Sequence, residues 1–316
     1  MSKYSRVLNF LRSEPWAITH EKLVEIEGLI ELKAHGVTMS EEEIQARIGD
    51  APSPSRSKQG SIAVIPLHGV ISHRAGGLNE SIGGISTERF AGYFRHAISD
   101  DSVRAIVMDI DSPGGTIAGV TELHREIMSA RGQKPIVAHV NALSASAAYW
   151  IASAADEIWS TPSGTVGSIG VITSYLDVTK AEESGGMTRT VIAAGKHKAE
   201  GFGPLTADAM GYLQGRVDEA YSTMVSDIAS GRGRRVSEVR EGFGEGRVVS
   251  ATAAKNMGMI DRIATLDQAI GRLSQRRVSG LMRAEAGDAE PIAEASTPEP
   301  LSSPEMVINA VVDTAE

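Results

Sequence analysis

The stretch that most constrains the fold joins an apolar, β-branched segment to a run of very small residues between Pro135 and Ser153. Pro135–Val140 has the composition of a buried strand, and the residues after Ser146 (Ala-Ala-Tyr-Trp-Ile-Ala) favour a helix. A sharp turn from that strand into the helix would place Ser146 at the helix N-terminus, where free backbone N–H groups converge. A nucleophile and the oxyanion that it creates would both be stabilised there. The alternative is close helix packing, which also favours alanine and serine.

Apolar segments and helical segments alternate around this stretch. Strands are predicted over Ser61–Leu67, Arg104–Ile110, Pro135–Val140, Glu157–Ser160 and Arg189–Ala193, and helices over Ser86–Ser99, from after Thr116 to about Ala130, over Thr206–Ser230 and over Ser250–Met257. The strand ending at Ile110 is almost continuously apolar, which is typical of a strand buried on both faces. The alternation predicts an α/β fold with a largely parallel sheet flanked by helices.

Composition divides the chain into four parts. Residues 1–50 carry a polar, amphipathic helical pattern and residues 51–59 form a Pro- and Ser-rich linker, so the first 59 residues are predicted to be an appendage outside the core. Residues 60–275 contain the alternating strands and helices, including a Gly-rich loop over 76–84 that is expected to be mobile. Residues 276–316 are rich in Ala, Glu and Pro, which predicts a disordered or scaffold-like tail.

Charge and cysteine content exclude several classes of function. The chain has no cysteine, which excludes disulfides, thiol catalysis and zinc sites built on cysteine. The formal net charge is −9, but the acidic excess follows Arg283, and no basic patch indicates nucleic acid. The longest apolar runs are about half of the roughly 20 residues that span a bilayer, and the N-terminus lacks the apolar segment of a secretory signal. A cytoplasmic protein without membrane contact is expected.

A possible oxyanion site follows the strand that ends at Ile110. Ser112-Pro-Gly-Gly115 comes where parallel α/β sheets bind ligands, and its glycines can direct N–H groups at a carbonyl oxygen. A plain tight turn is the alternative. Neither glycine motif for binding phosphate is present.

Two kinds of residue could serve as the base. The histidines at 124, 139 and 197 are one kind, with Asp109 or Asp111 to orient the imidazole; His124 and His139 lie inside a helical and a strand pattern, which fits structural roles better. Lys198 is the other kind, in a loop between two glycines. A lysine can act as a base when burial favours its neutral form, although most loop lysines are solvated. The Asp and His residues show no metal-ligand spacing.

Four motifs, in this order, resemble those of serine peptidases of the signal peptide peptidase A family, within the Clp protease/crotonase superfamily. They are Asp111-Ser-Pro-Gly-Gly, Ala145-Ser-Ala-Ala-Tyr-Trp, Gly167-Ser-Ile-Gly-Val and Gly195-Lys-His-Lys, and the resemblance covers roughly residues 60–270. It implies a Clp/crotonase-like fold, with Ser146 as nucleophile, Lys198 as general base and Ser168 as the residue that orients the lysine. It also implies an oxyanion hole built from the backbone of Gly114, Gly115 and Ala147.

The sequence departs from the family where two glycines usually follow the nucleophile, since Ala147 and Ala148 stand there. Alanine keeps its N–H, so activity is expected to survive, while the methyl groups narrow the site and favour a small side chain before the cleaved bond. An extended substrate is expected to pair as a strand along Thr116, Val166 and Gly167. No metal or organic cofactor is implied.

Within this family, the helical N-terminal part, Glu14-Pro-Trp-Ala-Ile, Lys196-His-Lys-Ala-Glu-Gly-Phe-Gly and the Ala/Pro/Glu-rich extension resemble head maturation proteases of tailed phages. That resemblance implies a ring or dome homo-oligomer in which neighbouring subunits complete the sites. It places the protein in the cytoplasm of the bacterial host, inside the procapsid, with scaffold, portal and capsid proteins as protein substrates. The alternatives are a cytoplasmic peptidase that degrades signal peptides and a non-catalytic scaffold or assembly protein.

Overall fold

The structure is a computed structural model that describes Arg12 and residues 14–34, 57–74 and 84–283. The chain divides into two compact units, Met1–Arg277 and Val278–Glu316. The predicted helix after Ser40, most of the linker, the glycine-rich loop up to residue 83 and the tail from residue 284 lie outside the described residues.

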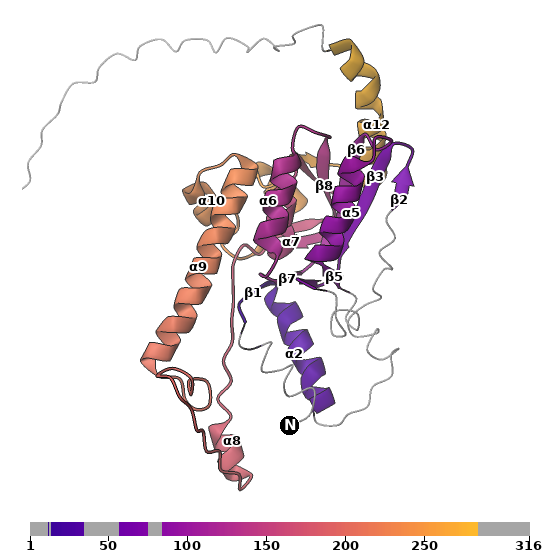
Figure 1. Ribbon diagram of the computed structural model, residues 1–316. Coiled ribbons are helices and arrows are strands. Elements are labelled where there is room, and N and C mark those ends of the chain that lie inside the picture. The colour runs from indigo at the N-terminus through magenta and orange to yellow at the C-terminus, as the bar shows by residue number, and fades with distance from the viewer. Residues whose placement is uncertain (1–11, 13, 35–56, 75–83, 284–316) are drawn as a thin grey trace, which may run out of the picture. The chain divides into compact units, whose positions relative to one another are not determined.

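A mostly parallel sheet of eight strands forms the body of the first unit (Figure 1). β3, β6 and β8 run parallel at its centre, β9 and β10 pair in parallel with successive parts of β8, and β2 and β11 are antiparallel. The strands, in sheet order, are β11 (Val248–Ser250), β10 (Thr165–Gly167), β8 (Ile136–Ala145), β6 (Ala105–Ser112), β3 (Ile62–His68) and β2 (Ser57–Gln59), with β9 (Glu157–Ser160) between β8 and β12 (Arg262–Ile263). The predicted α/β fold with a largely parallel sheet is confirmed.

Helices cover both faces of this sheet because β6 is apolar on both sides. Ile106, Met108 and Ile110 belong to the main core, together with α5, α6, α7 and α9, whereas Ala105 and Val107 belong to a second core against the start of α12. The helices are α5 (Thr87–Ser99), α6 (Val120–Ala130), α7 (Ala147–Ala152), α9 (Ala207–Arg232), α10 (Val236–Gly242), α11 (Ala251–Asn256) and α12 (Leu266–Arg283). The predicted helices after residues 86 and 206 are confirmed, and the side chains of Ser86 and Thr206 cap them.

One arginine fixes the end of α7 to the end of α9. The Arg131 guanidinium donates to the carbonyl oxygens of Ser153, Ala154, Ala155 and Gly231 at 2.5–3.0 Å. A Cβ on Gly231 would lie 2.2 Å from the Ser153 oxygen, so only glycine permits this approach. The short helix after Ser146 is therefore held at its far end by α9.

A second sheet brings the N-terminal segment into the core. Its order is β1 (Trp16–Ile18), β7 (Gly114–Thr116), β4 (Ile71–Ser72) and β5 (Ile85–Ser86). Ala17 belongs to the main core, and helix α2 (His20–Ala34) packs its apolar side chains against Trp16 and Ile18. The prediction that the first 59 residues lie outside the core is therefore wrong for residues 14–34. The end of the predicted linker is also ordered, as strand β2.

An exposed segment, residues 178–206 and here called the arm, leads into α9 and includes the short helix α8 (Thr179–Ser184). None of its residues is buried, and Ile192 is 95% exposed. Figure 1 shows the arm at the end of α9 that lies away from the large sheet. The strand predicted over 189–193 is wrong: the segment is apolar enough for a strand, but no described strand pairs with it.

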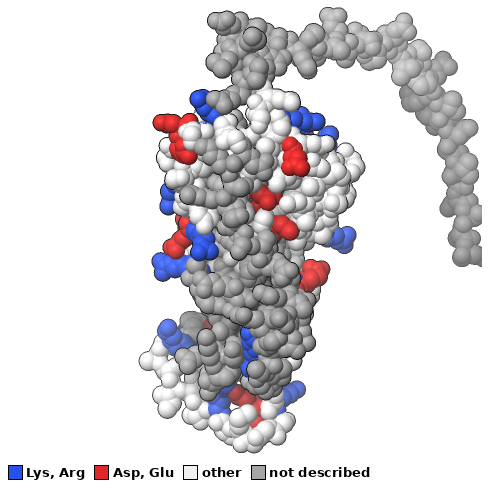
Figure 2. Space-filling model, turned by 90° about the vertical axis from the view of Figure 1, so that its right-hand side faces the viewer, with Lys and Arg blue, Asp and Glu red and all other residues white. Residues whose placement is uncertain are grey.

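The described surface mixes both signs of charge. On the face drawn in Figure 2, basic and acidic side chains alternate without a continuous area of one sign among the residues described. Within the described ranges, no helix combines the length and the apolar composition needed to cross a bilayer.

Candidate active site

Ser146 occupies a strained turn between β8 and α7. Its φ is 54° and its ψ is −116°, a backbone region that residues other than glycine rarely adopt. Among the described non-glycine residues, positive φ occurs at Ser146, Ser168 and Glu245, so two of the three are predicted site residues. Strain of this kind persists only where the surroundings hold it, and it gathers at functional sites. A serine on a sharp strand-to-helix turn has the arrangement of a nucleophile elbow.

Hydrogen bonds join this turn to the segment that contains Ser168. The Ser146 N–H donates to the Gly167 carbonyl at 2.7 Å, and the Ser146 Oγ donates to the Gly170 carbonyl at 3.2 Å. Ser168 lies between these two acceptors, is partly exposed, and donates its N–H to the Arg247 carbonyl at 2.9 Å. The structure thus brings the second and third predicted motifs together, although the role of the Ser168 hydroxyl stays a prediction.

The predicted oxyanion residues lie beside the same turn. A Cβ on Gly114, whose φ is +97°, would come 3.0 Å from the Ala145 oxygen and 3.1 Å from the Ala147 nitrogen. Gly114 therefore packs its backbone against both neighbours of Ser146, which only a glycine can do. The N–H of Ala147 is at the first turn of α7, where helix geometry provides no acceptor. Gly115 is equally confined, since its Cβ would lie 1.8 Å from the Ile71 oxygen.

The strands at the predicted substrate positions have both of their edges paired. Thr116 lies on β7, whose two edges pair with β1 and β4. Val166 and Gly167 lie on β10, which is already paired with β8 on one edge and with β11 on the other. A strand with two partners cannot accept a third, so substrate pairing at Thr116, Val166 or Gly167 requires one partner strand to leave and stays a prediction.

The structure does not bring Lys198 to Ser146 within one chain. Lys198 is exposed on the arm, whereas Ser146 is fully buried, and no hydrogen bond among the described residues joins the two. The helix α9 has 26 residues and is therefore about 39 Å long. The arm precedes the first residue of α9, whereas the elbow is held near the last residue of α9. The length of this helix therefore separates Lys198 from Ser146.

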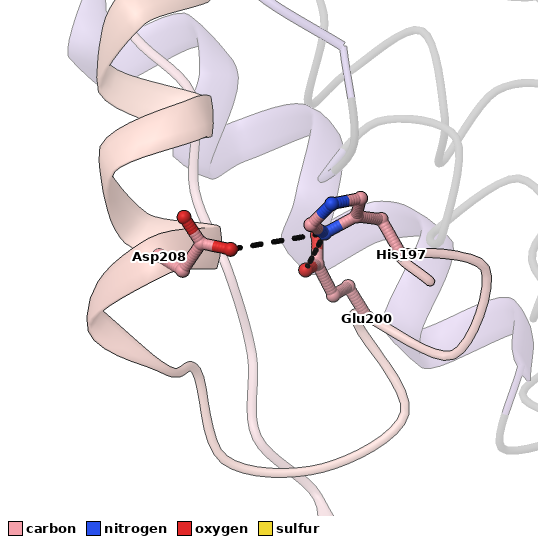
Figure 3. Close-up of side chains that lie close together, drawn as sticks. All are labelled: His197, Glu200 and Asp208. Atoms are coloured by element: carbon pink, nitrogen blue, oxygen red, sulfur yellow. Dashed lines mark hydrogen bonds and ion pairs between the residues drawn. The ribbon is translucent and has the colours of Figure 1, made fainter. Parts of the chain in front are cut away.

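A small polar cluster fastens the Lys198 loop to the first turn of α9 (Figure 3). The His197 Nδ1 lies 2.6 Å from the Glu200 Oε1 and 3.8 Å from the Asp208 Oδ2. The hydrogen bond to Glu200 raises the pKa of His197. The three groups lie within 4.8 Å of one another, close enough to bind a cation. The His197 Nδ1 is already hydrogen-bonded to Glu200, however, so we interpret the cluster as one that holds the loop in place. A neighbouring pocket of about 560 Å³ lies between the arm and α9; His197 lines it, whereas Ser146, Ser168 and Lys198 do not.

The other candidate bases have structural surroundings. His124 is buried with its Nε2 3.2 Å from the Ser153 Oγ, and burial, followed by the charges of Arg131 and Arg125, lowers its pKa to about 4. Its partner Ser153 lies at the end of α7 opposite Ser146. This agrees with the structural interpretation of His124.

A second group lies on the other face of the large sheet. The His139 Nε2 is 3.1 Å from the Ala264 carbonyl, and the His68 Nε2 is 3.0 Å from the Asp109 Oδ2. Burial would raise the pKa of Asp109, but His139 and His68 together lower it to about 2. The pKa of Asp111 is raised, mainly by burial. The hydrogen bonds found for these side chains do not involve Ser146, so they form a partly buried polar group apart from the elbow.

Comparison with known proteins matches part of the chain to a peptidase family. The model of Peptidase family S49 matches residues 129–279, a range that includes Ser146, Ser168 and Lys198. The chain belongs to this family of serine peptidases, the signal peptide peptidase A family.

Three curated relatives have about the same similarity. A putative protease of Methanocaldococcus jannaschii is 32% identical over 178 residues, which cover 56% of this chain and 57% of the relative. Capsid assembly protease C of Escherichia phage lambda is 31% identical over 225 residues, covering 70% and 51%. The head-tail preconnector protein GP5 of Enterobacteria phage P21 is 30% identical over 243 residues, covering 76% and 48%. The chain thus spans about half the length of these relatives. A solved structure of a membrane-bound stomatin-specific protease mutant has a TM-score of 0.45 and 16% identity, covering 69% of this chain and 86% of its own.

Proposed function

We propose that the chain is a serine endopeptidase in which Ser146 and Lys198 form the catalytic dyad, with each Lys198 supplied by a neighbouring subunit. The observation that carries the proposal is the strained, buried Ser146 turn, to which the Gly114 and Ser168 motifs converge. Membership of the peptidase family supports peptide hydrolysis as the reaction. The exposed position of Lys198 supports its delivery to another copy of the chain.

In this mechanism neutral Lys198 takes the Ser146 proton as the Ser146 Oγ attacks the peptide carbonyl carbon. The oxyanion accepts hydrogen bonds from N–H groups of the Gly114–Gly115 backbone and of Ala147. The protonated lysine then gives its proton to the leaving amine, and a water molecule hydrolyses the acyl ester by the same route, which regenerates Ser146. Ser168 orients the lysine. The proposal requires no metal or organic cofactor.

The apolar side chains exposed on the arm support a subunit interface there. Met187, Val191, Ile192 and Phe202 are 60%, 40%, 95% and 51% exposed, although they are apolar. Exposed apolar side chains gathered on one segment mark sites of protein association. Covering the arm with a second copy would also remove the lysine amine from water, which favours its neutral form.

The proposed substrates are capsid-assembly proteins, including scaffold, portal and the chain itself, during procapsid maturation in the cytoplasm of a bacterial host. The similarity to capsid assembly protease C and to the head-tail preconnector protein supports this choice.

The test is to follow the intact masses of the presumed scaffold and portal proteins over time. Wild type should trim them, and Ser146→Ala and Lys198→Ala should not. Lys196→Ala, on the same exposed loop, is the matched control and should trim normally. Trimming by Lys198→Ala would show that another residue is the base, and loss of wild-type activity with EDTA would contradict the dyad.

A further inference from the structure

Strand β1 lies where an extended substrate would pair beside Ser146. One edge of β1 pairs antiparallel with β7, in the register Trp16 with Thr116, Ala17 with Gly115 and Ile18 with Gly114. On its other edge, the Trp16 N–H donates to the Ile172 carbonyl at 2.7 Å and the Ile172 N–H donates to the Trp16 carbonyl at 2.9 Å. The segment is thus bound by backbone on both sides, as a substrate strand would be.

Both partners of β1 also border the elbow. The Gly170 carbonyl that accepts from the Ser146 Oγ comes two residues before Ile172. On the β7 side, the Cβ position of Gly114 lies 2.2 Å from the Ala17 oxygen and 3.1 Å from the Ala147 nitrogen. The Ala17 carbonyl therefore approaches the same side of Gly114 as a predicted oxyanion donor.

Side chains of β1 alternate between two environments. Ala17 is fully buried in the main core, to which Ala147 and Ala148 also belong. Trp16 and Ile18, 4% and 3% exposed, belong instead to the cluster formed with α2. Since successive side chains of a strand point to opposite faces, the elbow side of this position accommodates only a small residue.

We propose that β1 is a tethered occupant of the substrate position. Substrates would be extended segments with a small residue in place of Ala17, and they would bind only after β1 has left. This inference rests on the proposed function, because it assumes that the elbow acts on peptides. It adds a closed state and a rule for the substrate sequence.

Because the chain has no cysteine, a single disulfide can test the proposal in the full-length protein. Trp16 and Ile172 form a hydrogen-bonded antiparallel pair, whose Cα atoms are about 5.5 Å apart, within the range that a disulfide needs. In the variant Trp16→Cys/Ile172→Cys, oxidation locks β1 in place. Reduction releases it, and the loss of the buried Trp16 side chain weakens its docking.

Oxidised protein should cleave peptides about tenfold or more slowly than the same protein after reduction, and the reduced form should exceed wild type. Each single cysteine variant should be indifferent to the oxidant. Equal rates for the oxidised and reduced forms would overturn the proposal. A reduced form slower than wild type would also overturn it, because β1 would then be a required part of the site.

A binding measurement separates this proposal from the proposed function. The probe is a fluorescent copy of residues 14–19, Glu-Pro-Trp-Ala-Ile-Thr, used with the double cysteine variant that also carries Ser146→Ala. The peptide should bind the reduced form and not the oxidised form, and the same peptide with leucine in place of alanine should bind neither. This binding, without any turnover by serine-containing protein, would contradict the peptidase and support the role of β1. Turnover at the same rate by the oxidised and reduced forms would support the peptidase and contradict the role of β1.

Discussion

The elbow at Ser146 and the arm that carries Lys198 are built in opposite ways. The elbow is fully buried, bonded to Gly167 and Gly170, and fixed behind by Arg131. The arm has no buried residue and exposes apolar side chains such as Ile192. One half of the proposed dyad is thus completed by folding, while the other half requires a surface that the single chain does not provide. The proposed dyad therefore predicts that activity depends on assembly.

The strongest test of this difference between elbow and arm is to divide the dyad between two inactive variants. Ser146→Ala and Lys198→Ala should each be inactive alone. Assembled together at equal amounts, they should recover about one quarter of wild-type activity, because in a head-to-tail ring one site in four combines an intact serine with a neighbour's intact lysine. Peptidase rate after mixed assembly is the measurement. If both residues of a site came from one chain, the mixture would stay inactive.

Gly114→Ala should damage the elbow and leave the arm unchanged. The new methyl group would meet the Ala17 oxygen at 2.2 Å on a backbone with φ of +97°, so the chain there must move. Loss of a well-placed oxyanion donor lowers turnover by about 10²- to 10³-fold, which steady-state kinetics would show. Gly92→Ala, with no atom within 4 Å of the new Cβ, is the matched control. Normal turnover by Gly114→Ala would remove Gly114 from the proposed oxyanion hole.

Ile192→Glu should act on the arm alone. Because this side chain is 95% exposed, the free energy of unfolding of the single chain should change by less than about 0.5 kcal/mol. Light scattering should show a smaller assembly, and activity should fall with it. Tyr212→Glu is the control: Tyr212 is 64% exposed but lies on α9, outside the arm. An unchanged assembly would show that the arm is not the interface.

Acid should destabilise the elbow side through His124. Its pKa is lowered from 6.5 to about 4, so the unfolded chain binds a proton at a higher pH than the folded chain does. Stability from this group is complete above pH 6.5 and is lost as the pH falls toward 4, by about 3 kcal/mol. Urea unfolding at several pH values measures the loss. His124→Gln should reduce this part of the pH dependence, and an unchanged slope would show that the loss arises elsewhere.

Sequence patterns predicted the local parts of the molecule better than its long-range parts. The strand, the turn at Ser146 and the short helix after it depend on neighbouring residues, and the apolar run of β6 shows that it is buried on both faces. The burial of Trp16–Ile18 could not be read in the same way, because three residues give no periodicity and their partner β7 lies about a hundred positions away.

The error in the arm and the unpredicted pairing of β10 have related causes. Val191 and Ile192 have the composition of a strand, yet a strand forms only where another offers its edge, and none does so here. Val166 and Gly167 read as an open glycine-rich edge, because the antiparallel return of β11 more than eighty residues later is not visible locally.

The junction of Arg131 and Gly231 has a consequence for how much misfit the assembly can tolerate. Both α7, which has six residues, and α9, which has 26 residues, end at this junction. Ser146 is therefore about 9 Å from the junction along α7, and the arm is about 39 Å from it along α9. When α9 tilts about that junction, displacement grows with distance from it. Even if α7 turned rigidly with α9, a shift of several ångströms at the arm would therefore be about four times smaller at Ser146. The geometry would let an imprecise contact between the proposed subunits coexist with a precise position for the serine.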